Sequence, residues 1–197
     1  SKEHIKRLRR WSQLRKPWAQ LGLGNSYTTG LGVNKNFKRA FKLYKLAADQ
    51  GQHQAQFNLG SMYETGEGVI QSDELAFKFY KFSADQGYAN AQYNVGCMYA
   101  HGTGVEQSDT KAVEFYKLGA DQGERQAQNN LGLMYNSGRG VIRSTTLAFK
   151  FYKLSAEKGY ALAQYNLGNK YYRGICVEQS LTKAREWWTK AAKQGNE

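Results

Sequence analysis

The sequence repeats itself with a period of 36 residues, and this period is the strongest constraint on its fold. Two series of glycines keep that spacing: Gly60, Gly96, Gly132 and Gly168 in one, and Gly51, Gly87, Gly123, Gly159 and Gly195 in the other. Repeats of this length are typical of solenoids, in which each repeat buries its apolar face only against its neighbours. We therefore expect an array of stacked repeats rather than a globule built around one pocket.

Each period contains two stretches whose apolar residues have helical spacing. In the second repeat they occupy positions 55, 59, 62 and 63, and then 76, 79, 80 and 84. The second stretch always follows a side chain that can accept a hydrogen bond from the free N–H groups of a helix start: Asn36, Ser72, Ser108, Ser144 and Ser180. A glycine of the Gly51 series then closes it. The pattern predicts two amphipathic helices per repeat, which we call helix A and helix B.

Other glycines give two further expectations. The Gly60 series lies inside helix A, where glycine costs about 1 kcal/mol relative to alanine, so we expect close approach of a neighbouring helix to offset that cost. The loop from helix A to helix B carries Gly66 and Gly68 in the second repeat, but in the last repeat Cys176 replaces the second glycine. We expect that last loop to be distorted.

Together, these strings resemble a known family. Ala-Gln-aromatic-Asn-Leu-Gly-x-Met-Tyr, then Gly-x-Gly-Val, then Ala-Phe-x-aromatic-Tyr-Lys-x-Ala-Ala-x-Gln-Gly look like the Sel-one-like repeat, a relative of the tetratricopeptide repeat. The resemblance covers about residues 18–197 and is weakest in the first repeat. It implies an all-α fold, a right-handed α-α superhelix or solenoid of about five 36-residue helix-turn-helix repeats, and adaptor or scaffold roles. Related bacterial proteins include host-interaction factors and immunity proteins.

We expect a capping segment followed by one solenoid domain. Residues 1–17 form a degenerate, basic capping helix, and residues 18–197 form the solenoid. The repeats are expected at 18–51, 52–87, 88–123, 124–159 and 160–195.

Basic residues gather at the N-terminus. Residues 1–16 hold seven lysines and arginines against one glutamate, which accounts for half of the net charge of +12. A solvated cap explains this charge. The alternative is that this segment binds nucleic acid, an anionic lipid surface or an acidic protein, with Arg7, Arg9, Arg10 and Arg15 as the anion-binding candidates. We favour the cap.

The sequence gives no sign of an enzyme, a metal site or a cofactor. His4, His53 and His101 lack metal-ligand spacing, and no nucleophile motif occurs. The repeated Gly-x-Gly turns lack the Gly-Lys-Ser/Thr of a phosphate loop. Cys97 and Cys176 occupy different repeat positions, so we expect no disulfide framework. No apolar run is long enough to cross a bilayer, and the sequence does not indicate a compartment.

The outward-facing stripe of helix A is the expected binding surface. Positions 54, 57, 58, 61 and 65 face outward in the second repeat, and in helix-pair solenoids the A helices line the concave side. Its variable members are the candidate partner-binding residues: Gln54, Phe57, Ser61, Asn90, Tyr93, Cys97, His101, Gln126, Asn129, Leu133, Tyr165, Asn169 and Arg173. The recurrent Asn58, Asn94, Asn130 and Asn166 are open to two interpretations. They bind an extended peptide backbone, or they hydrogen-bond the adjacent repeat.

Our preferred hypothesis is a non-enzymatic module that binds a protein or peptide partner on its concave face, as a host-interaction or immunity protein would. The alternative is binding of nucleic acid or an anionic surface through the basic N-terminal segment. We expect a monomer. Its C-terminal edge, with Trp187 and Trp188 on an under-covered face, is the place where self-association is expected.

Overall fold

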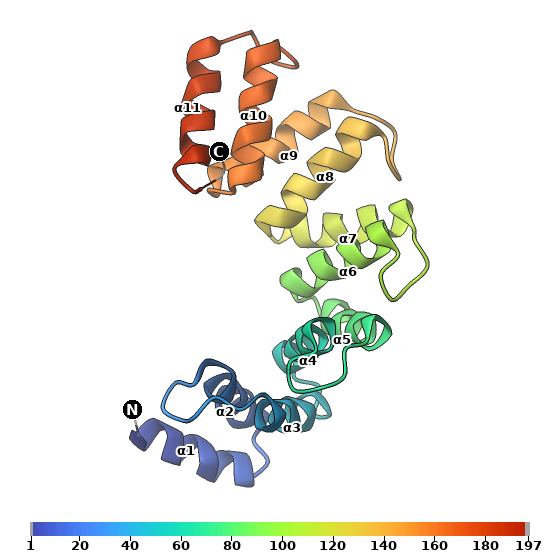
Figure 1. Ribbon diagram of the computed structural model, residues 1–197. Coiled ribbons are helices and arrows are strands. Elements are labelled where there is room, and N and C mark those ends of the chain that lie inside the picture. Colours follow the sequence, from blue (N-terminus) through green and yellow to red (C-terminus); the bar gives the residue numbers. More distant parts are fainter. Residues whose placement is uncertain (1, 196–197) are drawn as a thin grey trace. The chain divides into compact units, whose positions relative to one another are not determined.

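The computed structural model describes residues 2–195, and over that range the chain forms eleven helices and no strand (Figure 1). The helices are α1 (Lys2–Gln13), α2 (Pro17–Thr29), α3 (Phe37–Ala48), α4 (His53–Thr65), α5 (Asp73–Asp85), α6 (Ala89–His101), α7 (Asp109–Asp121), α8 (Arg125–Ser137), α9 (Thr145–Glu157), α10 (Ala161–Arg173) and α11 (Leu181–Ala192). The even-numbered helices are the predicted A helices, and the odd-numbered helices from α3 to α11 are the predicted B helices. The predicted all-α fold of paired helices is confirmed.

The helix ends follow the predicted signals. Ser72 accepts a hydrogen bond from the Leu75 N–H at 3.2 Å and thereby caps α5. Each B helix closes at its predicted glycine in the left-handed conformation, as α5 does at Gly87 with φ of 88°. Each A helix also ends at such a glycine, as α4 does at Gly66 with φ of 73°. A glycine takes this conformation without the steric penalty that a Cβ atom would bring.

The chain divides into two compact units. The first runs to Met98 and also includes Gly102–Glu106; the second consists of Tyr99–His101 and the chain from Gln107 onward. Within the first unit the main contacts are between helices that follow one another, from α1 to α5, and within the second they run in the same way from α7 to α11. This nearest-neighbour packing is the mark of a solenoid.

Glycines of helix A let an aromatic ring of helix B lie against the backbone. A Cβ atom on Gly60 would come within 2.6 Å of Tyr80, and one on Gly132 within 2.8 Å of Tyr152. In the last repeat the ring over Gly168 belongs to Trp188. Real Cβ atoms do not approach other atoms so closely, so the predicted close approach at these glycines is confirmed.

A buried glutamine of helix A ties successive repeats together, which sequence reasoning did not anticipate. The side-chain Nε2 of Gln56 donates to the Ala48 carbonyl of the preceding B helix at 3.5 Å. The Gln56 Oε1 accepts from Gln86 at 2.7 Å. The bond to the preceding B helix recurs, at 3.2–3.3 Å, for Gln92, Gln128 and Gln164. The Gln of the Ala-Gln motif is therefore architectural, because it satisfies a carbonyl at a helix end.

The loop at Cys176 keeps the backbone shape of the glycine loops, so the expected distortion is wrong. Cys176 has φ of 64°, the same value as Gly140 at the equivalent position. A non-glycine residue in this region costs about 1–2 kcal/mol.

Candidate functional site

The predicted partner-binding residues lie on the A helices α4, α6, α8 and α10, but they differ in exposure. Exposed members are Gln54, Asn90, His101, Leu133, Tyr165 and Arg173. Half-buried members are Phe57, Ser61, Tyr93, Cys97, Gln126 and Asn169. Asn129 is only 1% exposed, so its assignment to an open surface is wrong. We use the name A-helix stripe for the exposed and half-buried residues of these two sets.

In each unit a recurrent asparagine links neighbouring A helices. The Asn58 Nδ2 donates to Asn25 Oδ1 on α2 at 3.2 Å, and Tyr44 donates to the same oxygen at 2.7 Å. In the second unit, Asn166 on α10 donates to Asn129 Oδ1 on α8, also at 3.2 Å. For Asn58 and Asn166 the structural interpretation is confirmed.

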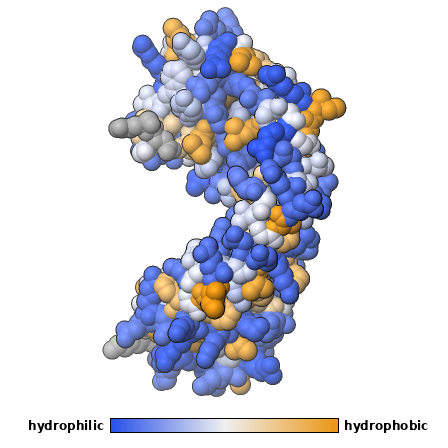
Figure 2. Space-filling model, turned by 45° about the vertical axis from the view of Figure 1, so that its right-hand side comes forward, coloured by the Kyte–Doolittle hydropathy of each residue, from blue (hydrophilic) through white to orange (hydrophobic). Residues whose placement is uncertain are grey.

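Phe57 also has a packing role. Its ring lies 5.3 Å from the ring of Tyr80 and 5.2 Å from that of Tyr88, distances typical of packed aromatic pairs. By contrast, Leu133 and Tyr165 in the second unit are 44% and 53% exposed. These two apolar groups are available for contact with another molecule. On the face drawn in Figure 2, hydrophobic residues form separate spots among hydrophilic ones.

A cavity opens at the end of the A-helix stripe in the second unit. Its volume is about 240 Å³, and its walls come from α8, α9, α10 and the loops beside them. It brings together two predicted residues, Asn169 and Arg173, with two cations that sequence reasoning missed, Arg143 and Lys170. The available signal was position 170, where the three preceding repeats carry methionine.

The basic residues of α1 do not form one patch. Ile5 and Leu8 are buried and pack α1 onto the first unit. Arg7 and Arg10 line a shallow hollow with Lys6, Trp11 and Trp18, among others. The exposed Arg15 lies in the turn that follows α1.

Arg9 faces a different group, the Tyr27 hydroxyl, near which Arg39 also lies. Burial acts to raise the pKa of Tyr27, but hydrogen bonds from Arg39 and Arg9 lower it overall. Arg9 is therefore engaged within the first unit, and Arg7 and Arg10 are the α1 arginines that line the hollow beside the tryptophans.

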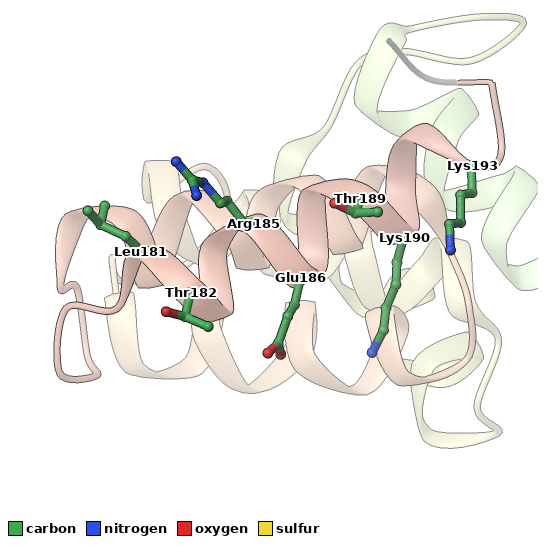
Figure 3. A pocket seen from close by; sticks show the side chains of 7 residues that line it. All are labelled: Leu181, Thr182, Arg185, Glu186, Thr189, Lys190 and Lys193. Atoms are coloured by element: carbon green, nitrogen blue, oxygen red, sulfur yellow. The ribbon is translucent and has the colours of Figure 1, made fainter.

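Most of the side chains that line a hollow along α11 carry a polar or charged group (Figure 3). Thr182, Glu186 and Lys190 project to one side of the helix. Arg185 stands where earlier B helices have Phe41 and Phe149, whose rings contact the next A helix. The residues that line this hollow belong to α11 and its C-terminal end, and they converge on no common centre.

The two tryptophans of α11 pack inward. Trp187 packs against a cluster of Ala156, Ala163 and Leu167, and Trp188 covers Gly168. Both are half-buried. Trp188 is less buried than Tyr80, Tyr116 and Tyr152, its equivalents in earlier repeats. Self-association at this edge stays a prediction.

Within residues 2–195, no group of three or more histidine, cysteine, aspartate or glutamate residues could hold a metal ion. No helix in that range combines the length and hydropathy that crossing a membrane requires.

Comparison with known proteins identifies the repeats. The model of the Sel1 repeat family matches residues 19–52, 53–88, 89–124, 125–160 and 161–196. No curated protein matches the sequence.

Three solved structures illustrate the similarity. A Sel1 repeat protein from Oxalobacter formigenes is 35% identical, with a TM-score of 0.88 over 92% of this chain and 72% of its own. The protective antigen c5321 of uropathogenic Escherichia coli is 33% identical, with a TM-score of 0.89 over 98% of this chain. This chain spans only 41% of that antigen's length. The immunity protein PA5088 of Pseudomonas aeruginosa is 25% identical, with a TM-score of 0.58 over 88% of this chain and 65% of its own.

Sel1 repeat proteins are generally non-enzymatic scaffolds for protein–protein interaction. The family model matches nearly the whole sequence in five consecutive copies, at the period seen in the residues themselves. The chain belongs to the Sel1 repeat family.

Proposed function

We propose that this protein is a non-enzymatic adaptor that binds a protein or peptide partner on the A-helix stripe, the predicted concave side. The observation that carries the proposal is that recurrent and variable positions of the A helices have different roles. Recurrent positions such as Asn58 and Asn166 hold the repeats together, whereas the variable Leu133 and Tyr165 leave much of their side chains exposed. Exposed aromatic and aliphatic groups on a rigid helix are suitable anchors for a partner.

Two partner classes are the first to screen. Similar structures include a protective antigen and an immunity protein, so a host protein and a bacterial toxin are the partners that we propose to test. The hypothesis of nucleic acid binding through α1 differs in its salt dependence. Phosphate contacts weaken steeply as salt rises, whereas contacts through Leu133 and Tyr165 respond weakly.

The test compares two double variants for binding of a captured partner. Leu133→Ala with Tyr165→Ala removes the exposed apolar groups of the stripe. The control, Leu118→Ala with Leu147→Ala, removes exposed leucines from the B helices α7 and α9. We expect the stripe variant to lose about tenfold or more in affinity, because anchor residues contribute more than about 1 kcal/mol each. The control should bind as the wild type does.

Circular dichroism checks that both variants stay folded. A folded stripe variant that retains the wild-type affinity for every partner would remove the A-helix stripe from the proposal. Binding that disappears at moderate salt in all three proteins would instead favour the basic α1 segment.

A further inference from the structure

The cavity of the second unit has an unusual lining. Its walls are Asn136, Arg143, Thr145, Tyr152, Asn166, Asn169, Lys170, Arg173 and Ile175. Three of these residues are cations, three are asparagines and none is acidic. We call this cavity the cationic pocket.

Lys170 occupies a core position. The equivalent residues of the three preceding repeats, Met62, Met98 and Met134, are buried in the apolar core. Lys170 is only 7% exposed, and its Nζ atom donates to Asn136 Oδ1 at 2.7 Å. Replacing a core methionine by a buried ammonium costs free energy unless the charge is compensated. The fold of the other repeats does not need this charge.

The lining of the pocket supplies no carboxylate to Lys170, whose ammonium lies 5.9 Å from the centroid of the Tyr152 ring and donates to a neutral amide oxygen. Burial lowers the pKa of Lys170, and the nearby charges of Arg143 and Arg173 lower it further, with an opposing contribution from Cys176. Among the described residues, none of the three cations takes part in an ion pair. The pocket therefore holds positive charge without a protein counter-charge.

Arg143 also departs from its repeat equivalents. Its Nε atom donates to the Asn136 carbonyl at 3.1 Å. At the equivalent position, glutamine makes the same bond to the end of helix A in three other repeats: Gln71, Gln107 and Gln179. A neutral glutamine is therefore sufficient for the structural bond. The arginine adds a guanidinium whose remaining N–H groups suit a planar or tetrahedral oxyanion.

We propose that the cationic pocket binds an oxyanion, a carboxylate or a phosphate group, with Lys170, Arg143 and Arg173 as the charged donors. This inference rests on the proposed function, because the oxyanion that the pocket binds is an acidic group of the proposed partner. The amide of Asn169 supplies a neutral donor in the same pocket. A bound oxyanion provides the counter-charge that buried Lys170 lacks.

The test titrates the chain with sodium succinate and with inorganic phosphate, at constant ionic strength maintained with sodium chloride. Side-chain amide signals of Asn136, Asn166 and Asn169 are followed by NMR. We expect saturable shifts in the wild type with at least one of the two anions. The one that saturates at lower concentration identifies the source as a carboxylate or a phosphate.

Two variants report on the pocket itself. Lys170→Met and Arg143→Gln each install the residue that other repeats carry at that position, so both are expected to fold. Each should weaken the saturable binding about tenfold or more, because a charge-assisted hydrogen bond is lost. Lys117→Met makes the same charge change on the exposed face of α7 and should leave the affinity unchanged.

The proposal is overturned if neither anion gives saturable shifts, or if Lys170→Met binds as tightly as the wild type. An equal loss in Lys170→Met and Lys117→Met would also overturn it, because that result indicates attraction by net charge alone. The titration requires no partner protein. Its failure therefore differs from the failure of the proposed function, which depends on Leu133 and Tyr165 in the capture experiment.

Discussion

Replacing Tyr80 by alanine is expected to lower the free energy of unfolding by about 3–5 kcal/mol, the range for removing a buried aromatic side chain. Tyr80 is 1% exposed, and its ring fills the space over Gly60. Its hydroxyl donates to Glu64 Oε2 at 2.5 Å. Burial raises the pKa of the Tyr80 hydroxyl, and the hydrogen bond and charge of Glu64 raise it further. The neutral, donating phenol is therefore the form that the fold requires.

The measurement is urea denaturation followed by circular dichroism, and Tyr165→Ala is the matched control. Tyr165 is half exposed, so its truncation should change stability by less than about 0.5 kcal/mol. Equal losses for the two variants would mean that the tyrosine of helix B does not form the repeat core. It would also mean that Tyr165 is not free to serve as a binding probe.

Gly132→Ala is expected to cost about 2–3 kcal/mol, although alanine favours a helix over glycine by about 1 kcal/mol. A Cβ atom at this position would lie 2.8 Å from two carbons of the Tyr152 ring and 3.3 Å from the Ala148 carbonyl oxygen. Tyr152 is itself buried, so its ring cannot move aside without opening a cavity elsewhere. The steric cost therefore exceeds the gain in helix propensity.

A double-mutant cycle with Tyr152→Ala isolates that steric cost. With the ring removed, Gly132→Ala should become neutral or stabilising by up to about 1 kcal/mol, since only the helix propensity remains. If the glycine substitution were equally costly in both backgrounds, the close approach of α8 and α9 would not explain why this position is glycine.

The helix pairs and their ends were predictable because each signal occurs in several copies. Ser72 and its equivalents mark the start of helix B in successive repeats. The predicted helix start therefore does not depend on the match in any single repeat. The glycines facing aromatic rings were predictable for the same reason. The conformation of the Cys176 loop was not predictable, because the sequence alone does not reveal whether a residue that replaces glycine keeps a positive φ, here 64°.

The candidate site was less predictable, because a repeat position does not fix how deep a side chain lies. Asn129 takes the place that Phe57, Tyr93 and Tyr165 have in other repeats. A short amide lies close to the backbone, where Asn129 is buried and accepts a hydrogen bond from Asn166. Lys170 is the opposite case. Its repeat position belongs to the buried face of helix A, so its side chain was not expected to line a site. Only the structure places its charge beside Arg143 and Arg173.

Hydrogen–deuterium exchange of the chain, alone and bound to a captured partner, tests the proposed binding surface most directly. We expect slower exchange on binding in peptides that cover the A helices of the stripe, above all α8 and α10, with little change in α7, α9 and α11. Slower exchange confined to the B helices, or to the basic residues of α1, would contradict it.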